Sequence, residues 1–387
     1  MKTKYILRIA IPLLVFVSGC ATIEDFFDTV RGPGATAQVR ALKKRPVEEP
    51  INTNRFVIES PDQSVVGVPQ VVFTNDRDTL SDFAREYGLG YDELIAANPD
   101  VDPWLPGANT PILLPTQFVL PDVPREGIVL NIASKRLFYF PRDGVRRDPD
   151  TGDVQSQIVL SFPIGIGRVG WETPLGSTTV VSKAEDPSWW VPASVRREHA
   201  ELGDPLPAVV PPGPENPLGT RVLKLKLPGY LIHGTNQPAG VGMRVSHGCV
   251  RLYPENIEFL YELVGIGEPV TIINEPYLMG RRYGEWYFEG HVPLADDTID
   301  PEKRITSLFD DADEAFSPPL KDHVRAIASA GRGVPVRVAQ FDDAEVFTRV
   351  RRVHNSVEVD PDAPTLEEVR EMIDEAVAEA SLEEDGV

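Results

Sequence analysis

One stretch of the sequence carries residue types that together could perform acyl transfer. Residues 233–252 contain Ser246-His247-Gly248-Cys249, so a thiol lies sixteen residues after His233 and two after a second histidine. A thiol attacks a carbonyl as thiolate, and it needs an imidazole to take its proton and donors for the oxyanion that forms. The amides of Gly248 and Cys249 could point at one oxygen, because glycine lets the backbone approach a ligand closely. We therefore expect a site with a nucleophilic cysteine.

Two other interpretations of these side chains stay open at this point. A single cysteine is often a small buried apolar residue, and a single histidine is often structural. His233, His247 and Cys249 are also ligand types that zinc accepts, but the stretch lacks paired-ligand spacing and an evident fourth ligand. The sequence also lacks a glycine-rich phosphate loop. We expect neither a metal nor a cofactor.

The stretch closely resembles the signature of the L,D-transpeptidases, whose YkuD-type catalytic domain has a first histidine, a glycine-rich spacer, Ser-His-Gly-Cys and an arginine. This resemblance implies that Cys249 is the nucleophile and His233 the general base. It implies an oxyanion-hole and supporting set made of Ser246, His247, Gly248 and Gly234. In some relatives a serine follows the first histidine and its backbone carbonyl orients the imidazole; glycine stands there in this chain, so only a side-chain role is in question.

Further residues are expected to contact the substrate. Arg251 matches the arginine of the motif, in either a supporting or a carboxylate-binding role, and Arg244 and Trp171 are added as substrate contacts. Residues 165–176 resemble the family segment that leads through Thr-Pro-x-Gly into a strand beside the site. The proline-rich insertion 187–219 resembles the cap over the cleft in the ErfK/YbiS branch. Its tryptophans, like Trp171, could belong to the core or to the substrate site.

The charge of the chain is uneven. The formal net charge is -21, and residues 296–387 hold 24 Asp and Glu against 10 Lys and Arg, which leaves only -7 for the rest. A net negative charge argues against a nucleic-acid partner. The only cysteines are Cys20 and Cys249, and each has a separate expected role, so we predict no disulfide between them.

The N-terminus has the form of a secretory signal. Basic residues precede a run of about nine apolar ones, which is too short to span a bilayer. Val17-Ser18-Gly19-Cys20 resembles a bacterial lipobox, which implies that residues 1–20 are a lipoprotein signal and that Cys20 is lipidated. An ordinary signal peptide is the alternative. Ala21 follows the cysteine where Asp would resemble an inner-membrane retention signal, so the expected location is the periplasm of a Gram-negative bacterium, anchored to the outer membrane.

Two segments are expected between this signal and the catalytic domain. Residues 21–60 lack sustained periodicity and are interpreted as a linker. Residues 66–116 predict a strand, two helices and a strand, with a capped helix at 78–87 and a second at 91–98. This order and the Leu-Ile-x-x-Asn-Pro sequence resemble a LysM domain, a module that binds peptidoglycan glycan. A small packing domain without a sugar site is the alternative.

Residues 125–275 predict a mainly β catalytic domain. Short apolar segments separated by Gly and Pro favour a β-sandwich-like fold, with one strong helix at 256–264 directly after the cysteine loop. The positive end of that helix would favour thiolate if the thiol lay near it. Residues 276–294 are interpreted as strands that close this domain. Residues 295–387 are expected to be an acidic, partly disordered tail with a helix at 365–380, either solvated or docking an envelope protein.

The resemblance implies an enzyme that acts on peptidoglycan. A thioester between Cys249 and the diaminopimelate of a tetrapeptide stem would release D-alanine, and an amine would then resolve it. The acceptor stays open: a second stem peptide gives a 3-3 cross-link, a C-terminal lysine of a lipoprotein gives attachment to the wall, and water gives a carboxypeptidase or a hydrolase. A non-catalytic peptidoglycan-binding scaffold is the alternative from another class.

Overall fold

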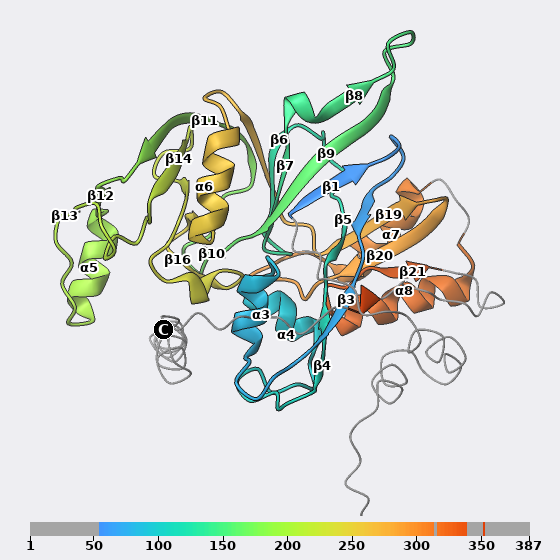
Figure 1. The fold of residues 1–387 in the computed structure, drawn as a ribbon, viewed down its shortest axis with the longest axis horizontal. Helices are drawn as coiled ribbons and strands as arrows, with labels where there is room; N and C mark the ends of the chain where they lie inside the picture. Colours follow the sequence, from blue (N-terminus) through green and yellow to red (C-terminus); the bar gives the residue numbers. More distant parts are fainter. Residues whose placement is uncertain (1–53, 313–315, 339–350, 353–387) are drawn as a thin grey trace, which may run out of the picture. The chain divides into compact units, whose positions relative to one another are not determined.

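The computed structural model describes residues 54–312, 316–338 and 351–352 of the 387 (Figure 1). A ten-stranded mixed sheet organises most of them. Across the sheet the order is β1 (Arg55–Ile58), β9 (Val154–Pro163), β7 (Arg136–Phe140), β6 (Gly127–Asn131), β18 (Pro269–Ile273), β11 (Gly176–Glu185), β14 (Arg221–Leu225), β15 (Leu231–His233) and β17 (Val250–Arg251), with β8 (Val145–Arg147) paired to β9. The β6–β18 and β15–β17 pairs are parallel.

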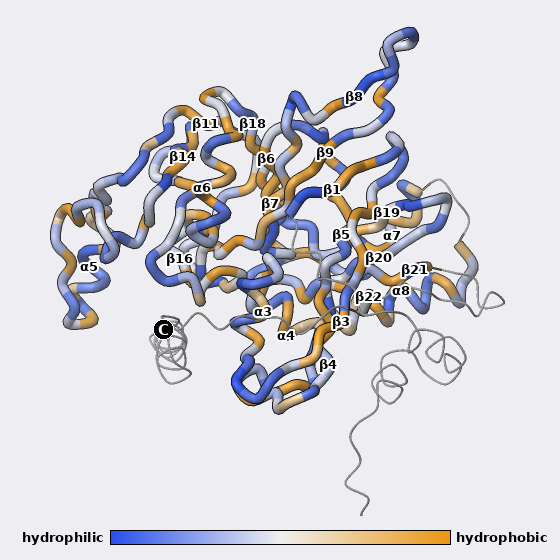
Figure 2. Tube along the Cα trace, viewed as in Figure 1, coloured by the Kyte–Doolittle hydropathy of each residue, from blue (hydrophilic) through white to orange (hydrophobic). Residues whose placement is uncertain are grey.

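The centre of this sheet is buried on both faces. All five residues of β6 and of β7 are buried, and hydrophobic residues concentrate along β7 and β9 in Figure 2. Because side chains alternate along a strand, Leu130 and Leu137 enter one hydrophobic cluster while Val129 and Phe138 enter another. A strand buried on both faces must be covered by other elements on both sides.

Helix α6 (Pro254–Leu263) covers the first face. Its Ile257 and Leu260 are fully buried in the cluster that also holds Leu130 and Leu137. The predicted mainly β fold is confirmed. Strand β11 joins two groups of strands, because it pairs with β18 through residues 176–179 and with β14 through residues 180–185. Both groups contribute side chains to this core.

The second face packs against the N-terminal region. This region has the predicted order of elements, with β3 (Gln70–Phe73), α3 (Leu80–Glu86), α4 (Tyr91–Ala97) and β4 (Pro111–Leu114), and β3 pairs with β4. Two short strands, β2 (Val65–Gly67) and β5 (Gln117–Val119), flank it. Phe83 and Leu94 share a cluster with Val129 and Phe138 of the main sheet. The N-terminal region thus shares a hydrophobic cluster with the main sheet.

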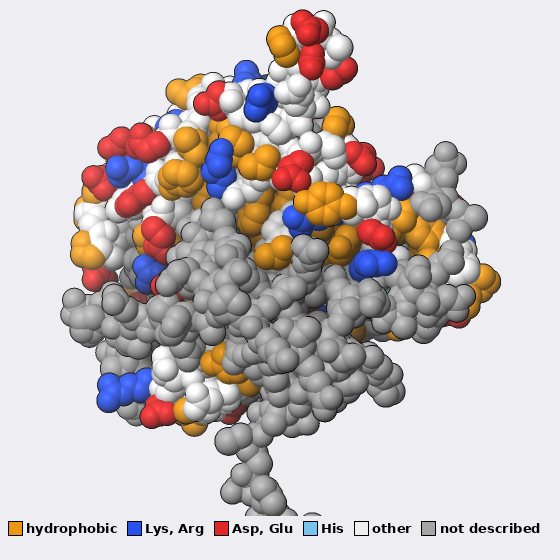
Figure 3. All heavy atoms as spheres, turned by 45° about the vertical axis from the view of Figure 1, so that its right-hand side comes forward, with side chains coloured by type: hydrophobic (Ala, Val, Ile, Leu, Met, Phe, Trp, Pro, Cys, Tyr) orange, Lys and Arg blue, Asp and Glu red, His pale blue; other side chains and the backbone are white. Residues whose placement is uncertain are grey.

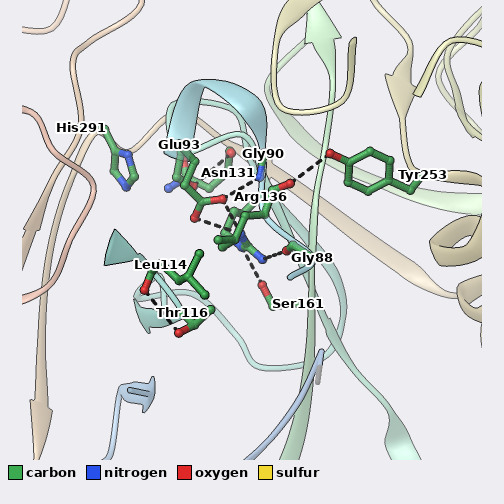
Figure 4. A network of polar contacts seen from close by, with 12 residues as sticks. Gly88, Gly90, Glu93, Leu114, Thr116, Asn131, Arg136, Ser161, Tyr253 and His291 are labelled. Atoms are coloured by element: carbon green, nitrogen blue, oxygen red, sulfur yellow. Dashed lines mark hydrogen bonds and ion pairs between the residues drawn. The ribbon is translucent and has the colours of Figure 1, made fainter. Parts of the chain in front are cut away.

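A buried ion pair also ties the N-terminal region to the main sheet (Figure 4). The guanidinium of Arg136 on β7 donates to both carboxylate oxygens of Glu93 on α4, at 2.6 and 2.9 Å. It also donates to Ser161 Oγ at 2.9 Å and to the carbonyl of Gly88 at 3.0 Å. The side chains of the pair are only 3% and 7% exposed, so their charges are shielded from water and depend on each other.

The predicted linker is too long at its C-terminal end. Residues 55–58 form β1 at the edge of the main sheet, antiparallel to β9, with Phe56 opposite Val159. No local periodicity marks a four-residue strand whose partner lies about a hundred residues away. The expected signal segment 1–20 with Cys20 and the linker up to residue 53 lie outside the described residues.

The C-terminal expectations also need correction. Residues 276–294 do not close the catalytic domain: β19 (Tyr277–Arg282) and β20 (Glu285–Gly290) form a separate sheet with β21 (Val336–Val338). Two helices within the expected acidic tail, α7 (Pro301–Asp311) and α8 (Pro318–Ala330), bury Phe309 and Val324 in one cluster with Phe288 of β20. Residues 276–338 thus form a folded unit. Strand β22 (Arg351–Arg352) pairs with β3, and the expected helix at 365–380 lies outside the described residues.

The surface is mixed in character. On the face drawn in Figure 3, acidic and basic side chains are interspersed with hydrophobic ones. Among the described residues no helix is both long enough and apolar enough to cross a membrane.

Candidate active site

Two parallel strands bring the predicted histidine and cysteine together. His233 is the last residue of β15, and Cys249 directly precedes β17. In the register of this pair, Ile232 lies opposite Val250 and His233 opposite Arg251. The backbone of Arg251 also exchanges two 2.9 Å hydrogen bonds with Gly165. The histidine and the thiol are sixteen positions apart in the sequence, and this pairing brings the end of β15 beside the start of β17, where Cys249 lies.

The His233 imidazole is buried, with 3% of the residue exposed. Its Nδ1 lies 2.6 Å from the carbonyl oxygen of Gly234, the backbone contact expected at that position. Burial first, and then the positive charge of Arg251, lower the pKa of His233 to about 3. The ring is therefore neutral at pH 7. With Nδ1–H donating to the carbonyl, Nε2 keeps a lone pair that can accept a proton.

The Cys249 thiol is free and partly exposed. Its Sγ donates to the carbonyl of Gly229 at 3.6 Å, and not to the imidazole. Burial raises the pKa of this thiol above its ordinary value of 9.0, while the Leu231 backbone and the Arg251 charge act in the opposite direction. Helix α6 begins five residues later, beyond β17, so the expected stabilisation of thiolate by the helix dipole does not dominate. In the resting protein both thiol and imidazole are neutral, and proton transfer must accompany attack on a substrate.

The backbone around the thiol is held in one orientation. Thr173 Oγ1 donates to the carbonyl of Gly248 at 3.0 Å, and Ser246 Oγ donates to the carbonyl of Cys249 at 2.5 Å. Because a trans peptide points its C=O and N–H in opposite directions, the Thr173 contact turns the Cys249 amide away from Thr173. In the part of the chain that the structure describes, no acceptor is found for that amide. It is therefore available to an oxyanion.

Gly248 is required by its conformation. Its φ of +97° lies in the region that L side chains avoid, and a Cβ there would lie 3.0 Å from Cε1 of Tyr230 and 3.3 Å from the Trp171 carbonyl. A side chain at this position would thus disturb the segment that carries the thiol.

His247 lies in a different environment from His233. Its Nε2 is 3.0 Å from Glu198 Oε2 and 3.2 Å from Arg168 Nη2, and Arg168 also pairs with Glu198. The Trp171 ring meets the imidazole edge-on, with ring centroids 4.9 Å apart. Burial, followed by the charges of Arg168 and Arg251, lowers the pKa of His247 to about 3. This ring is a support for the segment, since its nitrogen is already engaged.

The two predicted arginines lie in different surroundings. Arg251 places its positive charge near the thiol and both histidines. Arg244, predicted as a substrate contact, is engaged within the protein: its Nη atoms lie 2.5 and 2.6 Å from Asp296, and its Nε donates to the carbonyl of Gly167 at 2.9 Å. A substrate carboxylate would have to displace Asp296 to reach it.

The insertion 187–219, which was expected to form a cap, has secondary structure of its own, and its helix contacts His247. Strands β12 (Trp189–Trp190) and β13 (Val209–Val210) pair, and helix α5 (Ala193–Glu201) lies between them in sequence. The side chain of Asn216 holds the base of the cap, because its Nδ2 donates to the carbonyls of Pro187 and Pro211 at 2.7 and 3.1 Å. Trp190 is 77% exposed, so it is not a core residue. His199 on α5 lies 6.1 Å from His247 between ring centroids.

Sequence reasoning missed Thr173, Arg168 and Glu198. A signal existed for Thr173, which lies in the Thr-Pro-x-Gly segment. The other two are thirty residues apart in regions without periodicity, and only the folded chain joins them. Within the described residues, no three His, Cys, Asp or Glu side chains form a group that could hold a metal ion.

Comparison with known proteins agrees with this geometry. The family model described as the L,D-transpeptidase catalytic domain, YkuD, matches residues 125–272. The chain is 42% identical over 236 residues to "Probable L,D-transpeptidase YbiS" of Escherichia coli K12, covering 60% of this chain and 72% of that one. It is 37% identical over 294 residues to "Probable L,D-transpeptidase YcfS" of the same organism, covering 75% and 82%.

A solved structure, the catalytic domain of an Enterococcus faecium L,D-transpeptidase, is 22% identical, with a TM-score of 0.28, over 40% of this chain and all of that one. On the family model and the two relatives, the chain belongs to the L,D-transpeptidase family. Its relatives at about 40% identity are of the ErfK/YbiS type.

Proposed function

We propose that the chain is a peptidoglycan L,D-transpeptidase that works through a thioester on Cys249. The observation that carries this proposal is the placement of a partly exposed thiol and a neutral, oriented imidazole on adjacent parallel strands. His233 takes the proton of the thiol as the sulfur attacks the diaminopimelate carbonyl of a tetrapeptide stem. The C–N bond to the terminal D-alanine then breaks, and the protonated imidazole gives its proton to the leaving amine.

The tetrahedral intermediate needs donors for its oxyanion. The Cys249 amide, turned by the Thr173 contact with Gly248, supports this role, and such a donor contributes about 3 kcal/mol in comparable sites. The Arg251 charge favours any negative charge that develops near the sulfur. An amine resolves the thioester, with the neutral imidazole again taking a proton.

The acceptor in this proposal is an amine, either on a second stem peptide or on the C-terminal lysine of a lipoprotein. The cap beside the site supports aminolysis over hydrolysis, because covering a reactive thioester limits its access to water. The L,D-carboxypeptidase or peptidoglycan–lipoprotein hydrolase uses the same two side chains and is the outcome if water is the acceptor.

The setting of the enzyme is also proposed. The lipobox-like sequence at Cys20 supports a lipid anchor, in the periplasm and on the outer membrane. The LysM-like segment 66–116 supports binding to the glycan of peptidoglycan, and the acidic residues after 338 support docking of an envelope protein.

The test uses the full chain in detergent, mixed with purified disaccharide-tetrapeptide, with mass spectrometry of the products and Cys249→Ala alongside. Loss of D-alanine that depends on Cys249, together with dimer formation, is the expected result. Tripeptide alone identifies the carboxypeptidase. If neither forms, a lipoprotein with a C-terminal lysine is added as acceptor. Failure there, with sedimentation on peptidoglycan retained, identifies a non-catalytic scaffold.

A further inference from the structure

The cap contacts the segment around Cys249 through one carboxylate, that of Glu198. Glu198 lies on α5 and Arg168 lies just after β10 (Ile166–Gly167); they form an ion pair in which Arg168 is 8% exposed and Glu198 20%. The backbone N–H of Arg168 donates to the carbonyl of Ser246 at 2.9 Å, which fixes it beside the cysteine loop. The two side chains and His247 come from three separate segments and meet at one point.

The contact also involves the imidazole of His247. Arg168 binds Oε1 of Glu198, and the other carboxylate oxygen, Oε2, lies 3.0 Å from Nε2 of His247. Nη2 of Arg168, which can only donate, lies 3.2 Å from the same nitrogen. The imidazole is therefore held between the guanidinium and the carboxylate of the ion pair.

The ring is then held from two sides, by Glu198 at Nε2 and by the Trp171 edge at 4.9 Å between centroids. The next residue, Gly248, is held through its carbonyl by Thr173. His247 and Gly248, the two residues before Cys249, are thus both held by contacts with other parts of the chain. Only Val195 of α5 is buried, so the Glu198 link is a main attachment of the cap helix to the site.

We infer that Glu198, oriented by Arg168, is a positioning residue through which the cap helix holds His247 and the Gly248–Cys249 segment in the geometry that acylation of the thiol requires. This inference rests on the proposed function. It assigns the cap a part in the chemistry as well as in covering the site. Glu198 itself contacts neither the thiol nor the transferred group.

The kinetic test compares two Glu→Gln changes on the same helix. Glu198→Gln keeps the size of the side chain and removes its charge, and Glu201→Gln does the same at an exposed position. Acylation of Cys249 by a carbapenem is followed by intact mass on the full chain. We expect the acylation rate constant of Glu198→Gln to fall about 10-fold, since small displacements of positioning groups cost up to about 100-fold. Its half-saturating carbapenem concentration should change less than twofold, and Glu201→Gln should match the wild type.

A second measurement, NMR of the histidine side chains, detects the contact between Glu198 and His247 without any reaction. In the full chain labelled with ¹⁵N-histidine, the His247 signals are assigned with His247→Gln. Glu198→Gln should shift those signals and leave those of His291 in place. If the His247 signals do not move, the inference is wrong whatever the kinetics show. Should Glu198→Gln not fold, Arg168→Lys serves in its place, with an expected loss of about threefold to 10-fold.

Different results would contradict the role of Glu198 and the proposed function. A wild-type chain that is acylated at the same rate as both Glu→Gln variants contradicts the inference alone. A folded wild-type chain that neither a carbapenem nor a tetrapeptide acylates contradicts the proposed function and, with it, the role of Glu198.

Discussion

Two buried Arg–Glu pairs in this molecule have similar chemistry and different surroundings. Arg136 and Glu93 join β7 to α4, and the guanidinium of Arg136 also donates to Ser161 and Gly88. The Cζ atom of Arg136 lies 4.0 Å from the centroid of the Phe118 ring. Arg168 and Glu198 join the thiol-side loop to the cap, and the second carboxylate oxygen contacts His247. The charges of Glu289 and His291 act on the first pair, and neither residue belongs to the candidate active site. The second pair touches His247, two positions from the thiol.

The partners of each carboxylate distinguish an ion pair that stabilises the fold from one that supports the candidate active site. The arginines are similarly buried, at 3% and 8% exposed, while Glu93 is 7% and Glu198 20% exposed. The last partner of the carboxylate also differs: Glu93 accepts from the Gly90 amide that begins α4, at 3.0 Å, while Glu198 Oε2 lies 3.0 Å from Nε2 of His247. We therefore expect the first pair to govern stability and the second to govern rate.

The largest effect is expected from Arg136→Ala. Removing the guanidinium leaves the Glu93 carboxylate buried without its partner, which costs about 3–5 kcal/mol of unfolding free energy. Denaturant unfolding of the full chain measures this loss. Replacing both members, as Arg136→Met with Glu93→Leu, should recover most of it, since no charge is then left buried. A loss below about 1 kcal/mol for the single variant would contradict the assignment.

Acid should lower the unfolding free energy of the protein, because His233 binds a proton less readily in the folded chain than in the unfolded chain. The folded pKa of His233 is about 3 against 6.5 in the unfolded chain, so between these values the unfolded state binds more protons. Stability is therefore full above about pH 6.5 and falls as pH decreases toward 3. For this buried group the loss between pH 7 and pH 5 is about 2 kcal/mol. Unfolding curves of His233→Gln should show a smaller slope with pH; an equal slope would show that other groups dominate.

Matched amide variants test the comparison itself. Glu198→Gln should lower the acylation rate constant about 10-fold, equivalent to about 1.4 kcal/mol. It should lower stability less than Glu93→Gln does, because the Glu198 side chain is 20% exposed and the Glu93 side chain 7%. Glu93→Gln should lower stability and leave the acylation rate constant of the folded protein within about twofold. Thermal unfolding and carbapenem acylation are measured on both proteins. If each variant changed both quantities to the same degree, the distinction between the two pairs would fail.

A smaller effect is expected at Asp296. Its carboxylate holds Arg244 with two contacts of 2.5 and 2.6 Å, but Asp296 is 27% exposed, and pairs near water contribute about 1 kcal/mol or less. Asp296→Asn should therefore lower the unfolding free energy by that amount. If Arg244 also binds a stem carboxylate, the same variant should lower the KM for tetrapeptide, because the guanidinium no longer has to be taken from Asp296. A raised KM would argue against that role.

The sequence was sufficient to predict features whose residues lie close together along the chain. The thiol motif and the capped helix α3 each depend on residues within about twenty positions, and both are present in the structure. The Glu198 contact with His247 spans 49 positions, and no local pattern marks it.

The fold of residues 276–338 was missed for another reason. Asp300 caps α7 and accepts from two backbone amides, and a proline follows it, so a helix signal was present. The acidic composition of the whole segment concealed that Phe309 and Val324 lie on faces that bury each other. Strand β1 has four residues and gains its place only by pairing with β9.

The most direct test of the account looks for the thioester itself. The full chain is mixed with disaccharide-tetrapeptide, quenched in acid within the first turnover, and weighed as intact protein. The wild type should gain the mass of the disaccharide-tripeptide acyl group, located on Cys249, and Cys249→Ala should gain nothing and release no D-alanine. Release of D-alanine by Cys249→Ala at the wild-type rate would contradict the central claim.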